Sequence, residues 1–462
     1  KVKGVRFLAA DTTLHAKFEN AEFSMCQARH ICKVLELDQQ WEKPLTFATP
    51  GGILVDEDGR LRMYYELRWS HTERCCAVAF SDDGIVWTKP QLGLTQGKYF
   101  PEDNGDNNLI NLIDTKWYKG TCVFRDPVAA ADERYKMSWR MGGEMFTAVS
   151  ADGLTFRNVG MASNEGNLDS SNVSFLDPMT GKYTIYCRWW FDKFNAQGKK
   201  DPLPARLKRP NRTRRGVSMK RSDNWGGNWP GKRKLIIDPK NVLDDDGWID
   251  IYTPCVRPYY GQYVALPTVY FRVPFPDYTS SSGQLYPVFM HSVDGEQWHF
   301  PARKHPIIDL TANTEKKGEI GMVFCMSTML ERDSELWIYY VYHHRKHHEP
   351  REISTLPATI HLAKLRVDGF GVVRPKNGKI GQWTTPLLHL DKDVKALVLN
   401  VDAKGAVRVE VLDAKTKKAI KGFDVANALP ISGDHLNAQA TWKNARLEKL
   451  AGRNICLRFH LD

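Results

Sequence analysis

The sequence predicts an all-β protein in which a five-bladed β-propeller is followed by a C-terminal β-sandwich. A three-part phrase recurs five times: an apolar run, a second run rich in tyrosine or tryptophan, and a third run that ends in Ser-x-Asp-Gly or a relative of it. After Trp383 the pattern changes to short alternating stretches separated by lysine-rich turns. A repeat made of short strands and tight turns is typical of blades arranged around an axis.

The five phrases lie within residues 1–382, which we predict to form the propeller. Their alternating β-branched and aromatic residues favour strands, and their Asp-Gly turns favour hairpins. The third runs of the phrases are 77–87, 146–156, 217–225, 289–298 and 360–370. Short side chains suit tight turns, so we expect a structural role for the turn aspartates. They are Asp83, Asp152, Asp223, Asp294 and Asp368.

Residues 383–462 are predicted to form the second domain. Apolar and polar residues alternate in 396–401, 407–412 and 455–460, and lysine-rich turns separate these stretches. Such a pattern is typical of an antiparallel β-sandwich.

Length and composition are consistent with a large core and a smaller second domain. The chain has 462 residues, of which 42% are hydrophobic. No apolar stretch is long enough to span a bilayer, and no signal peptide is evident, so we expect no membrane partner. The first residue is Lys1, which is compatible with a mature, exported product. We expect a secreted or periplasmic protein.

Cysteine usage predicts neither a zinc site nor a dense disulfide framework. The count of nine is odd, and no Cys-x-x-Cys occurs. Cys122, Cys187, Cys255 and Cys325 lie in apolar strand patterns, where a free cysteine behaves as a small buried hydrophobe. We therefore expect no metal and no cofactor.

The formal net charge of +11 is concentrated in a basic stretch from Lys199 to Arg221. A solvated loop between two strands of the third blade is one interpretation. The other is a lip that binds an acidic or sulfated polysaccharide. Nucleic acid is not expected as a partner, because no recognised nucleic-acid module accompanies the charge.

Acidic residues at the innermost strands indicate catalysis by carboxyl groups. The innermost strands of a propeller converge on an axial pocket, so carboxylates at the same place in successive innermost strands can face one small volume. Glycoside hydrolysis needs one protonated carboxyl group and one ionised carboxylate, and repulsion between the acids would separate their pKa values. The candidate catalytic residues are Asp126, Asp169, Asp250 and Glu319.

One segment resembles a known family. Phe124-Arg125-Asp126-Pro127, followed by Tyr135-Lys136-Met137 and a Ser-x-Asp-Gly turn, is similar to the Arg-Asp-Pro segment of glycoside hydrolase family 32 and its relatives, families 43 and 68. The resemblance implies that Asp126 holds sugar hydroxyls and stabilises the transition state. It also implies that Asp169, in the stretch 168–175, stands at the position of the general acid. The architecture is similar over nearly the whole chain, whereas motif identity is limited to Arg-Asp-Pro.

The first blade departs from that family. The family has a nucleophilic aspartate in Asp-Pro-Asn-Gly, but this chain reads Ala48-Thr49-Pro50-Gly51-Gly52 and places Thr49 there. A threonine hydroxyl without an activating base is a poor nucleophile. The candidates to replace it are Asp250, Glu319, Asp103 and Asp106. An inverting mechanism would fit a carboxylate that is set back to leave room for water.

Basic and aromatic side chains complete the predicted site. Arg125 and Arg188 are candidates to orient the carboxylates or bind the sugar. Trp189 and Tyr270 end second strands and are candidates for sugar stacking, although packing between blades explains them equally well. His343 ends the corresponding strand of the fifth blade and is a candidate for binding substrate.

These observations predict a glycoside hydrolase that removes a terminal sugar, such as a fructosyl or arabinofuranosyl unit, from an oligo- or polysaccharide. Two alternatives stay open. A sialidase is suggested by the repeated Ser-x-Asp-Gly-x-x-Trp phrase, which is one residue short of the sialidase spacing. A non-catalytic carbohydrate-binding propeller is suggested by Thr49 at the nucleophile position and by the basic, aromatic surface.

Overall fold

The computed structural model describes most of the chain. It covers residues 6–42, 48–69, 73–95, 105–166, 168–169, 171–191, 215–239, 249–274, 281–302, 304–310, 321–347, 356–376 and 378–462. Strands make up nearly all of the regular structure in these residues, together with short 3-10 helices such as Thr12–Leu14 (η1) and Leu447–Leu450 (η7). The predicted all-β class is confirmed. Within this described part, no helix has the length and hydrophobicity of a membrane span.

The chain divides into two compact units. The first consists of Lys1–Arg6, Gln27–Leu330 and Leu336–Lys364, and the second of Phe7–Cys26, Glu331–Glu335 and Leu365–Asp462. This division differs from a boundary at residues 382 and 383, because the second unit begins already at Leu365 and includes an N-terminal segment that joins it by strand pairing. The pairs are β1 (Lys17–Glu19) with β27 (Gly381–Thr384), and β2 (Ala21–Met25) with β26 (Gly371–Pro375).

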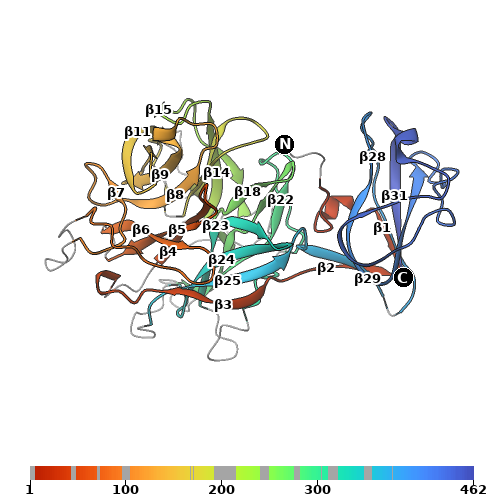
Figure 1. The fold of residues 1–462 in the computed structure, drawn as a ribbon, viewed down its shortest axis with the longest axis horizontal. Helices are drawn as coiled ribbons and strands as arrows, with labels where there is room; N and C mark the ends of the chain where they lie inside the picture. Colours follow the sequence, from red (N-terminus) through yellow and green to blue (C-terminus); the bar gives the residue numbers. More distant parts are fainter. Residues whose placement is uncertain are drawn as a thin grey trace. The chain divides into compact units, whose positions relative to one another are not determined.

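Each repeated phrase forms an antiparallel group of strands in the first unit (Figure 1). The innermost strands are β4 (Ala48–Val55), β8 (Lys119–Arg125), β12 (Val173–Leu176), β18 (Val256–Tyr259) and β23 (Met322–Arg332). The strands that follow in the first two groups are β5 (Leu61–Arg68), β6 (Arg74–Ser81), β9 (Tyr135–Met141), β10 (Glu144–Ser150) and β11 (Thr155–Ser163). The short strands β7 (Asn111–Leu112) and β15 (Gly227–Asn228) pair with β11.

The remaining groups are built in the same way. In the third, β13 (Tyr183–Trp190), β14 (Arg215–Ser222) and β16 (Lys234–Ile237) follow β12. In the fourth, β19 (Gln262–Ala265) and β22 (Met290–Ser292) follow β18, and a neighbouring ladder joins β17 (Ile249–Thr253), β20 (Thr268–Pro274) and β21 (Ser281–Pro287). In the fifth, β24 (Glu335–His343), β25 (Thr359–Arg366) and β3 (Arg29–Glu36) follow β23.

Side chains of the innermost strands meet around a common axis. Ser327 in β23 donates a hydrogen bond of 2.6 Å to the carbonyl of Gly51 in β4, and its Oγ lies 3.7 Å from the Sγ of Cys122 in β8. The thiol of Cys122 also points to the carbonyl of Ser174 in β12, at 3.7 Å. Cys255, just before β18, donates to the carbonyl of Met326 at 3.2 Å. This arrangement is that of a β-propeller. The number of blades stays a prediction.

The last group takes its outer strand from the beginning of the chain. β3 pairs antiparallel with β25, from Glu36 opposite Thr359 to Arg29 opposite Lys364. The ladder thus joins residues more than 300 positions apart in the sequence. It closes the ring of strand groups through main-chain hydrogen bonds.

The second unit has its own sheet and core. The sheet order is β1-β27-β31-β29-β30, with β29 (Val398–Asp413), β30 (Ile431–Gln439) and β31 (Asn454–Leu461), while β28 (Leu388–His389) pairs with β31. Trp383 stacks on Phe459 with ring centroids 4.8 Å apart. Trp442 donates 2.9 Å to the carbonyl of Val409 and packs against Phe423. This unit is the predicted β-sandwich.

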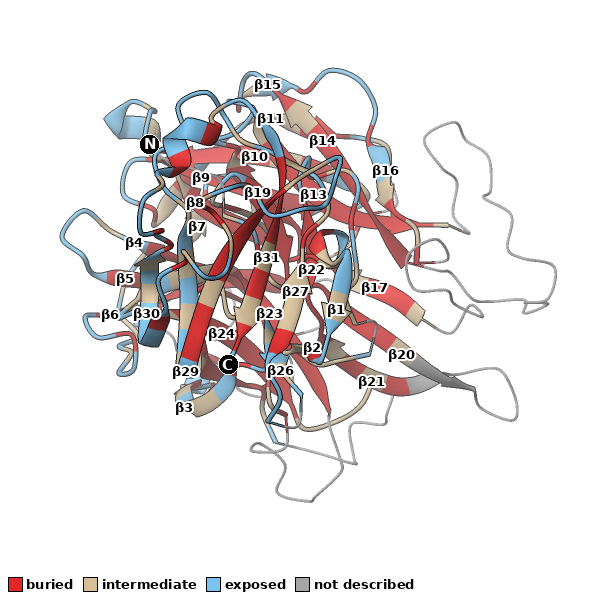
Figure 2. Ribbon diagram, turned by 90° about the vertical axis from the view of Figure 1, so that its right-hand side faces the viewer, coloured by how far each residue is buried: buried red, intermediate tan, exposed pale blue. Residues whose placement is uncertain are grey.

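Burial follows the strands (Figure 2). Second-strand tyrosines are among the largest fully buried side chains, including Tyr64, Tyr186 and Tyr339. A buried phenol hydroxyl needs a hydrogen-bond partner. Each of these three hydroxyls donates 2.8 Å to a glycine carbonyl in a turn of another phrase, so the packing of one group on the next has a fixed register.

Candidate functional site

The innermost strands have two ends of different character. We call the end where these strands begin the pocket end, and the end where they finish the turn end. Lys119 begins β8 and Asp126 directly follows it. A strand rises by about 3.3 Å per residue, so these two residues lie roughly 20 Å apart.

Asp126 lies at the turn end. Its side chain accepts 2.7 Å from the hydroxyl of Tyr183 and 3.1 Å from the backbone N–H of Val128, and the residue is 2% exposed. Arg125 beside it forms an ion pair with Glu57. The structure therefore does not bring Asp126 or Arg125 together with the other predicted site residues.

Two further aspartates occupy the position of Asp126 in their own groups. Asp56 follows β4 and accepts 2.7 Å from the hydroxyl of Tyr135. Asp177 follows β12 and accepts 2.6 Å from the hydroxyl of Tyr263. In each case an aspartate after one innermost strand holds a tyrosine of the next phrase. The repetition gives Asp126 a structural explanation.

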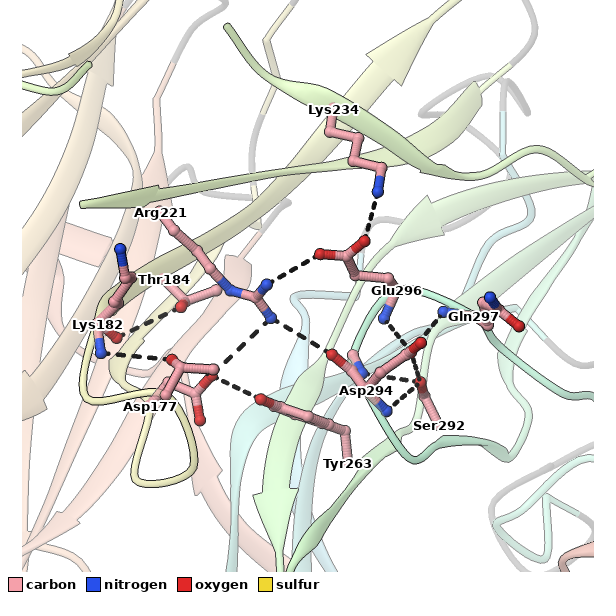
Figure 3. A network of polar contacts seen from close by, with 12 residues as sticks. Asp177, Lys182, Thr184, Arg221, Lys234, Tyr263, Ser292, Asp294, Glu296 and Gln297 are labelled. Atoms are coloured by element: carbon pink, nitrogen blue, oxygen red, sulfur yellow. Dashed lines mark hydrogen bonds and ion pairs between the residues drawn. The ribbon is translucent and has the colours of Figure 1, made fainter. Parts of the chain in front are cut away.

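The Ser-x-Asp-Gly turns have the structural role predicted for them. Asp83 accepts 2.8 Å from the backbone N–H groups of both Ile85 and Val86, and Ser81 accepts 2.8 Å from that of Gly84. The turns with Asp152 and Asp294 repeat this pattern. Figure 3 shows the Asp294 turn beside the Asp177–Tyr263 pair, where Arg221 bridges Glu296 at 3.0 Å and Asp177 at 4.0 Å.

At the pocket end, the structure brings Asp169 and Arg188 together. They form an ion pair in which Arg188 is almost fully buried while the Asp169 side chain is 30% exposed. The other nitrogens of Arg188 donate 2.6 and 3.2 Å to the carbonyl of Tyr252 in β17. Asn172 donates 2.9 Å to the carbonyl of Asp169. Asp169 is thus held firmly and still reaches solvent.

Asp250 also lies at this end. It is 0% exposed, and it accepts 2.6 Å from the guanidinium of Arg215 and 3.3 Å from the backbone N–H of the same residue. The Arg215 guanidinium lies 4.4 Å from the ring centre of Trp190 and 5.7 Å from that of Tyr270. Burial acts to lower the pKa of Arg215, but Asp250, Tyr252 and Asp169 together outweigh burial and raise that pKa.

A third carboxylate, Glu66, was missed by the sequence reasoning. It is 2% exposed, and it accepts from Arg74 at 3.3 Å and from the backbone N–H of Gly120. Glu66 pairs in register with Thr49, the residue at the family's nucleophile position. Residues directly opposite in antiparallel strands share a face of the sheet. A charged residue within the buried run Leu61–Arg68 was the signal that could have identified it.

Two basic residues stand beside these acids. Lys119 and Arg140 are opposite each other in the β8–β9 ladder, and Lys119 is half-buried. Burial and then the nearby guanidinium groups of Arg140 and Arg74 together lower the pKa of Lys119 to about 8. The carboxylates of Asp169 and Glu66 act in the opposite direction. The five side chains therefore share one electrostatic environment.

A small axial cavity, with room for about one water molecule, adjoins the starts of the innermost strands. Its lining consists of Ser171, Asn172, Val173, Thr253, Cys255, Cys325 and Ser327. Ser171 and Cys255 have positive φ angles, 62° and 39°, which is uncommon for residues other than glycine. The Asn172 Oδ1 atom is buried without a hydrogen-bond partner among the described residues. Strain and an unpaired polar atom are typical of functional sites.

The other predicted residues vary in position. Trp189 follows Arg188 in β13 and so faces the other way, where Arg233 lies 5.3 Å from its ring centre. Tyr270 and His343 are buried, and His343 packs against Phe324. Asp106 is exposed.

Several predictions fall outside the described residues. These are Glu319, Asp103, the side chain of Thr49 and most of the basic stretch 199–221. Among the residues that are described, no three His, Cys, Asp or Glu side chains gather as a metal site would require.

Comparisons with known proteins give remote likenesses only. No protein-family model matches the chain, and no curated protein matches its sequence. An N-acetylgalactosamine deacetylase from F. plautii, solved with blood group B trisaccharide, is 11% identical with a TM-score of 0.45, covering 76% of this chain and 97% of its own. An α-L-arabinofuranosidase from Podospora anserina, solved with cellotriose, is 9% identical with a TM-score of 0.47, covering 74% and 98%.

A third similar structure belongs to glycoside hydrolase family 43. This β-xylosidase/α-arabinofuranosidase from a compost microbial metagenome, solved with xylotriose, is 13% identical with a TM-score of 0.41, covering 72% of this chain and 94% of its own. Likenesses this remote carry no argument about the chemistry of this chain, which rests on its own residues.

Proposed function

We propose that the chain is a glycoside hydrolase that removes a terminal sugar from an oligo- or polysaccharide at the pocket end of the propeller. The observation that carries this proposal is the set of three carboxylates at that end, Glu66, Asp169 and Asp250, each held by an arginine. Hydrolysis of a glycosidic bond needs two carboxyl groups on either side of the scissile bond. A rigid surrounding shell keeps such groups in position.

Asp169 is the carboxyl group that meets the substrate in this proposal. Its side chain is 30% exposed, whereas Glu66 and Asp250 are buried. We assign it proton donation to the leaving group, which agrees with the position that the family resemblance gives it. Asp250 or Glu66 supplies the second carboxylate. Glu66 is favoured by its register opposite Thr49, where the related families have their nucleophile.

The finer parts of the proposal come from the sequence. The Arg-Asp-Pro segment supports kinship with families 32, 43 and 68 and a furanoside substrate. We do not assign Asp126 the role of holding sugar hydroxyls, because it lies at the turn end and accepts a hydrogen bond from Tyr183. A secreted or periplasmic location, where such polymers occur, belongs to the same proposal.

The test is sugar release from a glycan panel that contains fructans, arabinans, pectic and algal oligosaccharides and a sialoside. The wild type is compared with Asp169→Asn and with Asp223→Asn, a matched control in an exposed turn. We expect release by the wild type and the control, and a loss of about 10²- to 10⁴-fold in kcat for Asp169→Asn. Full activity in Asp169→Asn would contradict the assignment. Release from the sialoside alone would favour the sialidase alternative.

A non-catalytic carbohydrate-binding propeller is the second candidate. It is favoured by the burial of Glu66 and Asp250, both of which form ion pairs with arginines. In that case no glycan in the panel is cleaved, some bind, and the affinity of Asp169→Asn stays close to that of the wild type.

A further inference from the structure

We propose that the pocket end contains a subsite for an oxyanion carried by the sugar, a uronate carboxylate or a sulfate ester, and that Lys119 and Arg140 hold it. This inference rests on the proposed function and narrows its substrate to an acidic glycan.

The balance of charge at the pocket end supports the subsite. Each of the three carboxylates has its own arginine there, in the pairs Glu66–Arg74, Asp169–Arg188 and Asp250–Arg215. Lys119 and Arg140 remain, and neither forms an ion pair with a carboxylate among the described residues. Among the described residues of the pocket end, these two cations are therefore left without a carboxylate partner, and they lie side by side.

The strand start is shaped to keep these two cations close together. Gly120 follows Lys119 with a φ of +66°, and a Cβ atom there would lie 2.7 Å from Asn172 Nδ2 and 3.1 Å from Arg140 Cγ. Only glycine allows this close approach without a shift of its neighbours. The missing side chain lets Arg140 lie directly against the main chain that carries Lys119.

Arg140 is fixed and still has donors to offer. Its Nη1 atom donates 2.7 Å to the carbonyl of Gly142 and 2.8 Å to that of Leu168, which sets the plane of the guanidinium. Its Nε atom is buried without a hydrogen-bond partner among the described residues. A guanidinium held in one plane is suited to a planar or tetrahedral oxyanion, and the flexible ammonium of Lys119 adds a point charge.

The titration of Lys119 agrees with this geometry. Its neighbours in charge are Arg140, Arg74, Asp169 and Glu66, and burial together with the two arginines brings its pKa to about 8. A bound oxyanion would stabilise the protonated amine and raise that pKa. Binding of the anion should therefore weaken as the pH rises above 8, where the free protein loses the proton.

The test uses monosaccharides, which cannot be hydrolysed. Galacturonic acid, galactose 6-sulfate and galactose are titrated by calorimetry and ligand-detected NMR against the wild type, Lys119→Met and Lys182→Met. Lys182 is a matched control, an exposed lysine at the turn end. Thermal unfolding of each variant checks its fold. Where the glycan panel gives turnover, kcat/KM for acidic and neutral oligosaccharides is compared in the same variants.

We expect one acidic sugar to bind about tenfold more tightly than galactose at pH 7, and the preference to shrink at pH 9. Lys119→Met should abolish this preference, whereas Lys182→Met should retain both the preference and the affinity for galactose. A preference for the uronate alone identifies a carboxylate, and a preference for galactose 6-sulfate alone identifies a sulfate ester.

Three results would overturn the subsite. Equal affinity and equal kcat/KM for acidic and neutral sugars would show that there is no oxyanion subsite, while the glycosidase proposal would still stand. A preference that survives in Lys119→Met would assign the anion to other residues. If no sugar binds and no glycan is cleaved, the proposed function itself fails, and the subsite fails with it.

Discussion

The two ends of the innermost strands differ in how regularly they are built. At the turn end, Asp56, Asp126 and Asp177 follow successive innermost strands, and each accepts a tyrosine hydroxyl from the next phrase. Because the same contact recurs between successive groups, the packing of one strand group on another explains why an aspartate stands at this position. These aspartates and tyrosines therefore serve the contact between neighbouring strand groups.

At the pocket end no such repetition exists among the three carboxylates. Glu66 lies in a second strand, Asp169 precedes an innermost strand, and Asp250 lies in β17. The three acids therefore do not share one position in the strand groups, and no repeated contact between neighbouring groups explains them. Irregular charges at the converging end of a regular scaffold indicate function.

The comparison predicts opposite phenotypes for two aspartates, and this is the largest effect expected. Asp169→Asn should lose about 10²- to 10⁴-fold in kcat with little change in the midpoint of thermal unfolding. Asp126→Ala should keep kcat within a few-fold and lose about 1–3 kcal/mol of unfolding free energy, because the Tyr183 hydroxyl and the Val128 N–H lose their acceptor. Turnover assays and denaturant titrations measure both. The opposite result would place the chemistry at the turn end.

Breaking a buried ion pair should come next. Arg215→Met removes the cation that donates to the fully buried Asp250 carboxylate, and we expect a loss of about 3 kcal/mol in unfolding free energy. The double variant Arg215→Met/Asp250→Leu should recover part of that loss, because it buries no charge. If the single variant is as stable as the wild type, the pair does not organise the pocket end.

The third prediction concerns pH and a group at neither end. Burial, and then the charges of His30, Lys33 and His344, lower the pKa of His361 to about 3. At this residue the folded protein binds fewer protons than the unfolded chain, so the contribution of His361 to the free energy of unfolding falls as the pH drops below about 6.5, by up to about 1.4 kcal/mol per pH unit. Unfolding of His361→Gln should show a weaker slope between pH 6.5 and 4. An identical slope would assign the acid sensitivity elsewhere.

The smallest effect should follow from removing one hydroxyl at the turn end. Tyr263→Phe deletes the donor to Asp177, a bond of 2.6 Å, and we expect a loss of about 1 kcal/mol in stability with kcat unchanged. Tyr183→Phe is a matched variant at the next contact and should behave alike. A change in kcat for either would show that the turn end is coupled to the pocket end.

The sequence predicted those features that depend on residues close together in the chain, which are the strands and the tight turns. Strand alternation and Asp-Gly turns gave the all-β class and the role of the turn aspartates. Arg125 and Arg188 were predicted to orient the carboxylates or bind the sugar; Arg188 forms an ion pair with Asp169, and the functional roles of both stay a prediction. These predictions rest on short segments whose residues fix their own conformation.

Long-range geometry explains what the sequence did not reveal. The Arg-Asp-Pro segment does not say at which end of a strand about 20 Å long its aspartate lies. Glu66, Lys119 and Arg140 lie in three different strands, and they come together only when β5, β8 and β9 lie side by side. The pairing of β1 with β27 likewise joins residues far apart in the chain, which places residues 7–26 in the second unit.

The pairing of β3 with β25 has a consequence for biosynthesis. The ribosome releases Arg29–Glu36 early, but the partner Thr359–Arg366 emerges more than 300 residues later. At about 5–20 residues per second, the interval is roughly 15–65 s. Throughout that time residues 29–36 lack the strand that pairs with them in the folded protein, and an exposed strand edge without its partner is prone to aggregation. The ring of strand groups can therefore close only after residues 359–366 have been synthesised.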